Sequence, residues 1–521
     1  MKILFIILRD TAEYFNQVYL SYAISSCEVF FEKDIMFYED EKSLFVKLKN
    51  FQPHIVYLNI DNTDFKLNLS IANYINHIDE NIHITCGYLY ATCFYMKILS
   101  EHNVNSAIIG EIENTLVELC DCLKLNKPLT SIRGLAYKDS NKNIFVNPPR
   151  ECENNIDSLP FPERTPFNNT RSHYILGSRG CYNNCSFCCK NNLFATNKRP
   201  IQRFRSIDNI ILELDELSKK YNCKHVVFGD STVCDYKNPG TRLNELYSHL
   251  INKDYWMQFF IFLCPKQINL NTYIELKKLI NVGLHRVFIG IEAGNYNDLQ
   301  LYNKRTTIED NQRALKLLQS LKNENDLPYY FEPEYGFMNF NPYSTFDTLK
   351  ENIDFLYKTE LLINPSKLLS EVLVYYGTPM AEKVLKDGLS IDDDDYGYVK
   401  YRFQNESIEK FKKELTECVS VLDYKRTENI IILLNRYIRF FGKSELTECT
   451  IKQFHEYESL ASEYTYNLFY QVYGKYSDHK PENVIPFAEN AKNHLNEIYC
   501  EIGKKIKMIT IKLMRKGELV Y

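Results

Sequence analysis

Three cysteines stand close together in one short stretch of this chain, Cys181, Cys185 and Cys188. Their spacing is Cys-x3-Cys-x2-Cys, and an aromatic residue, Phe187, precedes the last thiol. The apolar run Tyr174–Leu176 predicts a buried strand, so the thiols lie on a loop that leaves its carboxyl end. Thiolates at such close spacing hold iron–sulfur clusters, because one small loop must wrap one compact cluster. Three ligands for four irons leave one iron open to a further ligand.

A structural zinc site is the alternative for the same sulfurs, with Cys189 as the fourth ligand. Tetrahedral zinc needs ligands that reach four separate corners, and the adjacent Cys188 and Cys189 reach two such corners with difficulty. Thiols packed in a core are a second alternative, yet the turn around them is rich in glycine and asparagine. The spacing therefore favours an iron–sulfur cluster.

The Cys-x3-Cys-x-aromatic-Cys spacing resembles the signature of the radical S-adenosylmethionine (SAM) superfamily. The resemblance implies a 4Fe–4S cluster on Cys181, Cys185 and Cys188, with SAM bound through its amine and carboxylate at the open iron. It further implies reductive cleavage of SAM to a 5′-deoxyadenosyl radical that removes a hydrogen atom from a substrate. We expect an external flavodoxin- or ferredoxin-type electron donor, because the chain has no flavin motif and no second cluster motif.

Length and composition set the broad class. With 521 residues, the chain should hold more than one domain, and its net charge of −5 gives no strong field for nucleic acid or anionic lipid. No apolar run is long enough to span a bilayer, and the apolar start is too short for a secretion signal. The 16 irregularly spaced cysteines then indicate reduced thiols plus a metal site rather than a disulfide framework. We expect a cytoplasmic protein that binds neither nucleic acid nor a membrane.

Residues 1–127 alternate short apolar strands with helical patterns. The expected strands are Ile3–Leu8, His54–Leu58, Ile82–Cys86 and Ser106–Ile109, and the expected helices span about 41–50, 65–78 and 91–102. Such alternation predicts a parallel, doubly wound α/β domain of the Rossmann-like type, in which ligands lie beyond the carboxyl ends of the strands.

This domain, followed by the cysteine stretch, is similar to the cobalamin-binding-domain subclass of radical SAM proteins, which includes the class B methyltransferases. By that resemblance, the residues expected to meet cobalamin are Gly87, Thr92, Gly110 and Glu111. The chain departs from the subclass at Cys86 and Ile112, which replace glycines, and in the loop Arg9–Glu13, which lacks a proline-rich lead-in. It has no Asp-x-His-x-x-Gly motif to offer a lower axial histidine. The side chain of Cys86 is a steric objection to cobalamin, because backbone must approach the ligand there.

The rest of the chain predicts a connector, a barrel and a helical domain. Residues 128–170 form the connector, with a β-hairpin at 132–146 and a proline-rich passage after it. Residues 171–395 predict a partial (β/α)6 barrel, with strands at 174–178, 225–228, 259–263, 286–291, 329–338 and 368–375. Residues 396–521 predict an all-helical domain that closes the open barrel edge, with helices at 407–424, 427–441, 450–473 and 486–515.

The chemistry of such a barrel lies at the carboxyl ends of its strands. By resemblance, the residues expected to bind SAM are Gly229, Asp230, Ser231, Glu292, Tyr376 and Gly377. The carboxylates of Asp230 and Glu292 suit the α-ammonium and ribose diol of SAM in a partly desolvated pocket. The alternative for each carboxylate is a helix cap or a solvated side chain, and Gly377 alternatively serves only its own turn.

Four further residues are candidates for substrate chemistry. Glu332 and Glu334 share one face of the fifth expected strand, where they could contact substrate or ribose inside the barrel. Cys234 and Cys264 follow the second and third expected strands and could donate a hydrogen atom to a substrate radical. A solvated strand edge is the alternative for the acids, and buried inert cysteine is the alternative for the thiols.

Three functions compete. The first is a radical SAM enzyme acting at an unactivated carbon of a natural-product or peptide substrate, by cobalamin-dependent C-methylation or by cobalamin-independent rearrangement, epimerisation or ring formation. The second is a methylthiotransferase, but that class has a cysteine just after the first strand and a terminal β-barrel, where this chain has Arg9-Asp10-Thr11 and a helical tail. The third is a non-catalytic iron–sulfur protein, which leaves the open iron without a purpose. We expect the first.

Overall fold

The computed structural model describes residues 1–8, 17–28, 30–61, 65–164, 172–190, 195–196, 199–200, 202–391, 398–422, 424–425, 429–476 and 484–518. The loop Arg9–Glu13, noted above for its departure from the subclass, lies outside these residues. The chain divides into two compact units. Unit 1 comprises Met1–Val233, Leu373–Lys383 and Asp392–Lys400, and unit 2 comprises Cys234–Val372, Val384–Ile391 and Tyr401–Tyr521. No helix in the described part of the chain has the length and apolar character needed to cross a bilayer.

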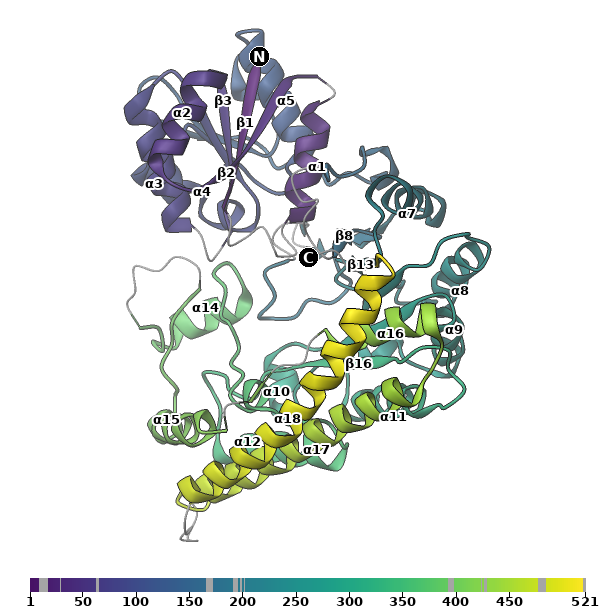
Figure 1. The fold of residues 1–521 in the computed structure, drawn as a ribbon. Helices are drawn as coiled ribbons and strands as arrows, with labels where there is room; N and C mark the ends of the chain where they lie inside the picture. The colour runs from purple at the N-terminus through teal and green to yellow at the C-terminus, as the bar shows by residue number, and fades with distance from the viewer. Residues whose placement is uncertain are drawn as a thin grey trace. The chain divides into compact units, whose positions relative to one another are not determined.

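Unit 1 begins with the expected doubly wound sheet (Figure 1). Its strand order is β2-β1-β3-β4-β5-β6-β7. The parallel strands are β1 (Lys2–Leu8), β2 (Glu32–Tyr38), β3 (Ile55–Asn59), β4 (His83–Gly87) and β5 (Ser106–Ile108). The expected hairpin, β6 (Leu135–Lys138) and β7 (Ile144–Val146), extends the sheet antiparallel to β5. The predicted α/β class of this region is confirmed.

Helices cover both faces of this sheet (Figure 1). They are α1 (Gln17–Glu28) and α5 (Glu113–Lys124) on one face, and α2 (Glu41–Phe51), α3 (Phe65–Ile78) and α4 (Leu89–Glu101) on the other. In β1, Ile3, Phe5 and Ile7 join the core beneath α1 and α5, and the residues between them join the opposite core. Because successive side chains point to opposite faces and both faces are covered, this strand is apolar throughout.

Unit 1 also contains the strands around the cysteine loop. β8 (His173–Ile175) pairs in parallel with β13 (His225–Phe228), and β9 (Ser178–Arg179) pairs antiparallel with β12 (Arg203–Phe204). Helix α7 (Ile207–Tyr221) begins where Ser206 accepts a hydrogen bond from the Asn209 amide, as its sequence predicts.

Unit 2 contains the parallel strands β14 (Gln258–Leu263), β15 (Leu284–Glu292) and β16 (Glu332–Phe337). Its barrel helices are α8 (Pro239–Leu250), α9 (Leu270–Ile280), α10 (Tyr296–Leu301), α11 (Ile308–Asn323) and α12 (Phe346–Lys358). The prediction of a continuous sixth strand at 368–375 is wrong. Asn364 caps a short helix, α13 (Pro365–Leu368), and the strand is reduced to one bridge between Phe340 and Glu371. Helix α14 (Pro379–Lys386) follows.

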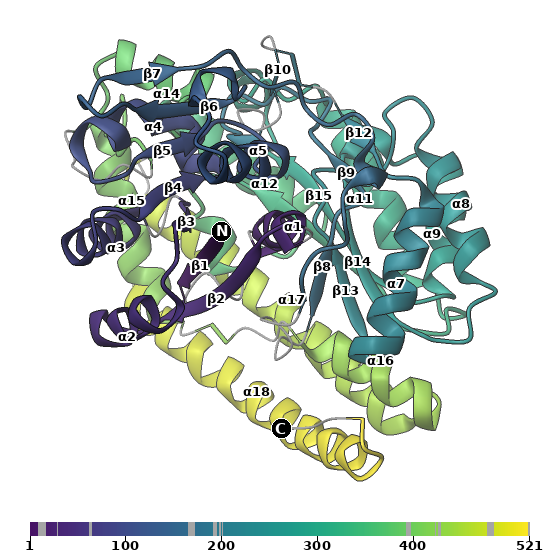
Figure 2. The same ribbon diagram turned by 90° about the horizontal axis from the view of Figure 1, so that it is seen from above.

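The C-terminal region is helical, as predicted (Figure 2). Its helices are α15 (Glu406–Ser420), α16 (Ile430–Phe441), α17 (Glu445–Tyr473) and α18 (Val484–Arg515), and the last three share one apolar core. The Asn435 side chain of α16 exchanges hydrogen bonds of 2.9 and 2.8 Å with the backbone of Tyr330, just before β16. Tyr466 of α17 stacks on Tyr357 of α12, with 4.0 Å between ring centroids. These helices therefore pack against α12 and the segment that leads into β16.

Gly283, in the turn after α9, lies close to the backbone of Met257 and provides a test of the packing there. Its φ is +119°, and an added Cβ would lie 2.0 Å from the carbonyl oxygen of Met257. We expect Gly283→Ala to lower the free energy of unfolding by about 1–3 kcal/mol, because backbone strain and a clash with backbone act together. Urea unfolding followed by circular dichroism measures the change. Gly503→Ala, at a site in α18 with no atom within 4 Å, is the control and should leave stability unchanged or slightly higher; equal losses would contradict the prediction.

Candidate active site at the cysteine loop and the strand ends

The cysteine loop is an ordered turn that leaves β9. Cys185 is buried, whereas Cys181 and Cys188 are half-buried. The Cys188 amide donates to the Cys185 carbonyl at 3.2 Å, and the Asn183 amide donates to the sulfur of Cys181 at 3.4 Å. Hydrogen bonds to ligand sulfur help to set the properties of an iron–sulfur cluster, so this donor suits a cluster thiolate.

The described residues contain no three Cys, His, Asp or Glu side chains that converge closely enough to hold one metal ion. A zinc site requires its ligands around a single ion. In a 4Fe–4S cluster each thiolate binds a different iron, so the sulfurs stand farther apart. Cys189, the fourth ligand in the zinc alternative, packs against the apolar core beneath α1 and α5. Three thiols in one loop fit the cluster.

The turn expected to bind SAM after the barrel lies directly on the cysteine loop. The Met380 amide donates to the Ser186 carbonyl at 2.9 Å. Gly377 has a φ of +74°, a conformation that glycine adopts without strain. The ring of Tyr376 meets Phe94 of α4 edge to face at 5.1 Å. The structure therefore brings Tyr376 and Gly377 together with the cluster cysteines.

Asp230 follows β13 and is buried. Its Oδ2 accepts a hydrogen bond of 2.9 Å from the amide of Gly177, in the segment that leads into the cysteine loop. A Cβ on Gly177 would lie 3.2 Å from Oδ1 of Asp230, so glycine permits this close approach. The Gly229 amide donates to the Ile175 carbonyl at 2.7 Å, and Ser231 is half-buried beside Asp230. Gly229 and Asp230 are thus bonded to the strand that precedes the cluster loop and to the residues just after it.

Arg179 carries a buried guanidinium just before the first cysteine. It donates to Oε1 of Glu113 at 2.6 Å and to Oε1 of Glu111 at 3.1 Å. Arg203, which pairs with Arg179 across β9 and β12, donates to the two oxygens of Glu111 at 2.8 and 3.1 Å. The acidic turn after β5 is thereby bonded to the strand that carries the cluster.

Both carboxylate oxygens of Glu111 accept hydrogen bonds from the protein. Its Oε2 also accepts the amide of Glu153 at 2.9 Å. Burial disfavours the charged carboxylate, but Arg179 and Arg203 outweigh burial, and the pKa of Glu111 is lowered. The sequence prediction placed Glu111 against cobalamin, whereas the structure places it in ion pairs of the protein itself.

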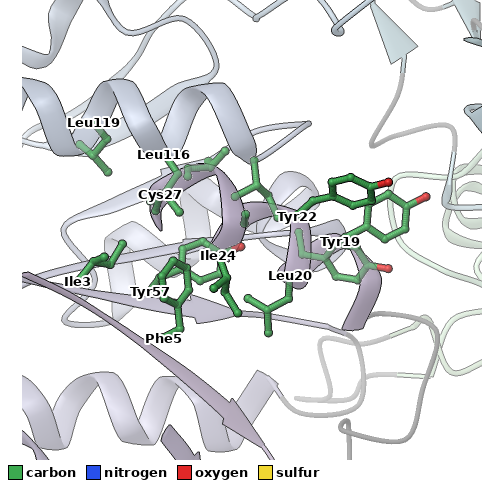
Figure 3. Close-up of a cluster of buried hydrophobic side chains, with 14 of the residues drawn as sticks. Ile3, Phe5, Tyr19, Leu20, Tyr22, Ile24, Cys27, Tyr57, Leu116 and Leu119 are labelled. Carbon is green, nitrogen blue, oxygen red and sulfur yellow. The ribbon is translucent and has the colours of Figure 1, made fainter. Parts of the chain in front are cut away.

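The steric objection to cobalamin depends on which face of the sheet the Cys86 side chain occupies. The Cys86 side chain is buried in the core beneath α2, α3 and α4, away from the face that holds Tyr57. A Cβ on Gly87 would lie 2.7 Å from the hydroxyl of Tyr57, so packing alone already requires glycine there. Tyr57 stacks beside Phe5 at 5.6 Å in the same core (Figure 3).

The neighbouring strand end is fixed by Thr92. Its hydroxyl accepts the amide of Gly110 at 3.1 Å and donates to the carbonyl of Tyr88 at 2.8 Å. The ends of β4 and β5 are adjacent in the sheet, and Gly110, just after β5, leaves backbone without a Cβ there. Backbone without a Cβ fits the close approach of a large flat ligand such as cobalamin. Thr92 supports this backbone.

Glu292 ends β15 in unit 2 with a strained backbone. Its φ is +68°, and the pairing with β16 shifts register between Gly290 and Glu292, which marks a β-bulge. Lys304 donates to Oε1 of Glu292 at 3.1 Å. Sparsely populated backbone conformations persist where the surrounding structure enforces them, and they cluster at functional sites.

Buried amides enforce this conformation. The side chain of Asn311 donates to the carbonyls of Ile291 and Ala293 at 3.2 Å each. Asn352 accepts the amide of Gly294 at 2.7 Å. The loop that presents Glu292 is therefore held on both sides.

Glu332 and Glu334 lie in β16, away from its carboxyl end. Glu332 is the first residue of the strand and pairs with Lys322 at 2.6 Å and with His455 at 3.6 Å. Glu334 pairs with Arg286 at 3.3 Å. The structure thus places both acids in protein ion pairs and does not bring them to the strand end that carries Glu292.

Cys234 and Cys264 are both buried. Gln267 joins the two segments, since its Nε2 donates to the Cys234 carbonyl at 3.0 Å and its Oε1 accepts the Cys264 amide at 2.8 Å. Sequence reasoning missed Gln267, Arg179 and Lys304. Arg179 could have been noted from its place beside the first cysteine, but no local pattern marks the other two.

Replacement of Arg179 tests the buried ion pairs. Arg179→Met removes the guanidinium that pairs with both Glu111 and Glu113. Because buried charges then lose a partner, we expect it to lower the free energy of unfolding by about 3–5 kcal/mol. The more exposed pair of Arg150 with Glu118, also in unit 1, supplies the control Arg150→Met, which should cost about 1 kcal/mol or less. Urea unfolding measures both, and similar losses would contradict the assignment. Adding Glu113→Gln to Arg179→Met should recover part of the stability.

Comparison with known proteins agrees with this geometry. Residues 175–334 match the family model described as the Radical SAM superfamily. An uncharacterized methyltransferase of Pyrococcus horikoshii is 26% identical over 279 residues, 52% of this chain and 58% of that protein. The 4′-phospho-dehydrooxetanocin synthase of Priestia megaterium is 27% identical over 351 residues, 60% of this chain and 44% of that protein. The chain thus spans about half the length of these curated relatives.

A solved structure shares the fold over the whole chain. The cobalamin-dependent SAM radical enzyme OxsB, solved with aqua-cobalamin bound, superposes with a TM-score of 0.73 at 18% identity. The match covers 100% of this chain and 81% of OxsB. The matched family segment contains the three cysteines, Asp230 and Glu292. Residues 175–334 are thus a radical SAM domain, the domain of a superfamily of enzymes whose cofactors are a 4Fe–4S cluster and SAM.

Proposed function

We propose that this enzyme uses SAM to functionalise an unactivated carbon of a small-molecule or peptide substrate, and that the reaction is C-methylation with cobalamin. The observation that carries the proposal is the set of contacts around the cysteine loop. Within one unit, the three thiols, the turn at Tyr376 and the buried carboxylate of Asp230 are joined by backbone hydrogen bonds. The methyltransferase of Pyrococcus horikoshii, similar over about half of this chain, supports the methyl-transfer reaction.

The residues of unit 1 would hold the cofactors of the first step. Cys181, Cys185 and Cys188 would bind three irons of the cluster. When bound, the cluster supplies one electron that cleaves SAM to methionine and a 5′-deoxyadenosyl radical. Asp230 offers a buried carboxylate for the α-ammonium of SAM, where a charge-assisted hydrogen bond is strong because water is excluded. The electron would come from an external flavodoxin- or ferredoxin-type protein.

Glu292 would orient the nucleoside of SAM. Its carboxylate lies on a backbone that the side chains of Asn311 and Asn352 hold in place. A carboxylate can accept hydrogen bonds from both hydroxyls of a ribose diol. Holding the donor in one orientation favours reaction at one carbon of the substrate.

Cobalamin would bind at the strand ends that bear Gly87 and Gly110. Its support is the fold shared with OxsB, solved with cobalamin bound, and the backbone of Gly110, which carries no Cβ. When bound, cobalamin supplies a carrier for the transferred methyl group. Thr92 would hold the two strand ends at a fixed spacing.

A cobalamin-independent radical rearrangement or ring formation is the second candidate. Packing against Tyr57 is sufficient to explain Gly87, and the ion pairs of Arg179 and Arg203 are sufficient to explain Glu111. One relative in sequence is named a synthase rather than a methyltransferase. Both candidates use the same cluster and the same radical.

The cluster assignment is tested by replacing its ligands. In anaerobically reconstituted protein, Cys181→Ser, Cys185→Ser or Cys188→Ser should abolish formation of 5′-deoxyadenosine after reduction and remove the charge-transfer absorbance of the cluster. Cys189→Ser is the matched control, since Cys189 packs against an apolar core, and it should retain both signals. Full activity in any of the first three variants, or stoichiometric zinc in the wild type, would refute the proposal.

Cobalamin binding separates the two candidates. We expect anaerobic reconstitution with hydroxocobalamin, followed by gel filtration, to leave the corrin absorbance with the protein. Gly110→Leu should weaken that binding, because a side chain then stands where the ligand approaches. If the wild type retains no corrin but still forms 5′-deoxyadenosine, the second candidate replaces the first.

A further inference from the structure

In the described part of the chain, only one carboxylate oxygen of Glu292, Oε1, accepts a hydrogen bond. Lys304 Nζ lies 3.1 Å from Oε1, and the two side chains are 5% and 14% exposed for Lys304 and Glu292 respectively. Low exposure strengthens such a pair, because little water competes with it. In the described part of the chain, Oε2 of Glu292 accepts no hydrogen bond. One oxygen is therefore fixed while the other is left for a partner outside the protein.

Gly290 makes room for this pair. A Cβ on Gly290 would lie 2.3 Å from Oε1 of Glu292 and 2.9 Å from Nζ of Lys304. Gly336, which faces Gly290 in the register of β15 and β16, makes room for the ring of Phe288, which an added Cβ would meet at 2.8 Å. The Glu292 side chain thus folds back over Gly290, and the ion pair fills the space that side chains would take.

The surrounding structure holds the backbone of Glu292 in its left-handed conformation. Its left-handed φ is set by the bulge after Gly290 and by the amides that bind the flanking carbonyls. Lys304 is fixed from the other side, because its amide donates to the Leu299 carbonyl at 3.0 Å at the end of α10. Both members of the pair are therefore rigidly placed.

We propose that Lys304 is a positioning residue of the SAM site. It holds the Glu292 carboxylate in one orientation, so that Oε2 accepts hydrogen bonds from the ribose hydroxyls of SAM. The missing side chain of Gly290 leaves the space that this orientation requires. The inference rests on the proposed function, in which Glu292 orients the nucleoside of SAM.

A double-mutant cycle on the reconstituted holoenzyme tests the proposal. We expect Lys304→Met to weaken binding of SAM about tenfold or more, the size of one lost charge-assisted hydrogen bond. Lys304→Arg should restore most of the affinity, since it keeps the charge. If Lys304 acts through Glu292, the double variant Lys304→Met with Glu292→Gln should bind SAM no worse than Glu292→Gln alone. Isothermal titration measures each affinity.

A ligand without the ribose diol gives a readout that a merely structural role would not change. The 2′,3′-dideoxy analogue of SAM should bind wild type and Lys304→Met almost equally, because the hydroxyls that Glu292 accepts are missing. Lys322→Met is the matched control: it breaks the Lys322–Glu332 pair, also in unit 2, of similar exposure and at the amino end of β16. It should leave the affinity for SAM unchanged.

The outcomes separate failure of this inference from failure of the proposed function. Unchanged SAM affinity in Lys304→Met, or additive losses in the cycle, would overturn the positioning role while the wild type still binds SAM. A reconstituted wild type that binds no SAM would instead overturn the proposed function. Urea unfolding of each variant shows whether a loss of affinity reflects a loss of fold.

Discussion

The buried ion pairs of Arg179 are the interaction on which unit 1 depends. Arg179 belongs to the strand that leads into the cysteine loop, whereas its partners Glu111 and Glu113 follow β5 of the N-terminal sheet. Charges removed from water are tolerated only when they are paired with good geometry. The N-terminal sheet and the cluster strand are therefore bound to a single relative position, and Arg203 reinforces it through the same Glu111. Whatever binds at Gly110 lies next to residues that touch the cluster strand.

Unit 2 fixes the carboxylate of Glu292 in a different way. Glu292 lies at a bulge with a left-handed backbone, and buried amide side chains rather than charges hold the loop. Amides satisfy backbone groups without the desolvation cost of an ion, so they suit a place where the one charge must remain for a ligand. Lys304 then places its ammonium group 3.1 Å from that carboxylate.

Much of the fold could be predicted because it depends on local pattern. Helix α3 and strand β13 have the predicted bounds, since each is an apolar segment with clear ends. Helix α1 was not predicted because residues 18–27 are all buried and show no apolar stripe. The predicted sixth strand failed for a local reason as well, since Asn364 and Pro365 begin a helix where the apolar run begins.

The site was predictable only in part. The three cysteines could be predicted as cluster ligands from their spacing, because one short loop must hold one cluster. The partner of Glu111 could not be inferred, because a carboxylate beside a glycine turn suits a ligand as well as a distant arginine. The pairing of Lys304 with Glu292 could not be predicted from the sequence either, because it depends on how α10 ends. Long-range pairs between charged residues carry no local signature.

The hydrogen bond from Met380 to Ser186 has a consequence for biogenesis. Unit 1 takes its last segment from far downstream, after nearly all of the barrel in unit 2 has been made. During synthesis the cysteine loop must therefore emerge from the ribosome long before the turn that covers it. Through that interval the nascent loop lacks its hydrogen bond to Met380.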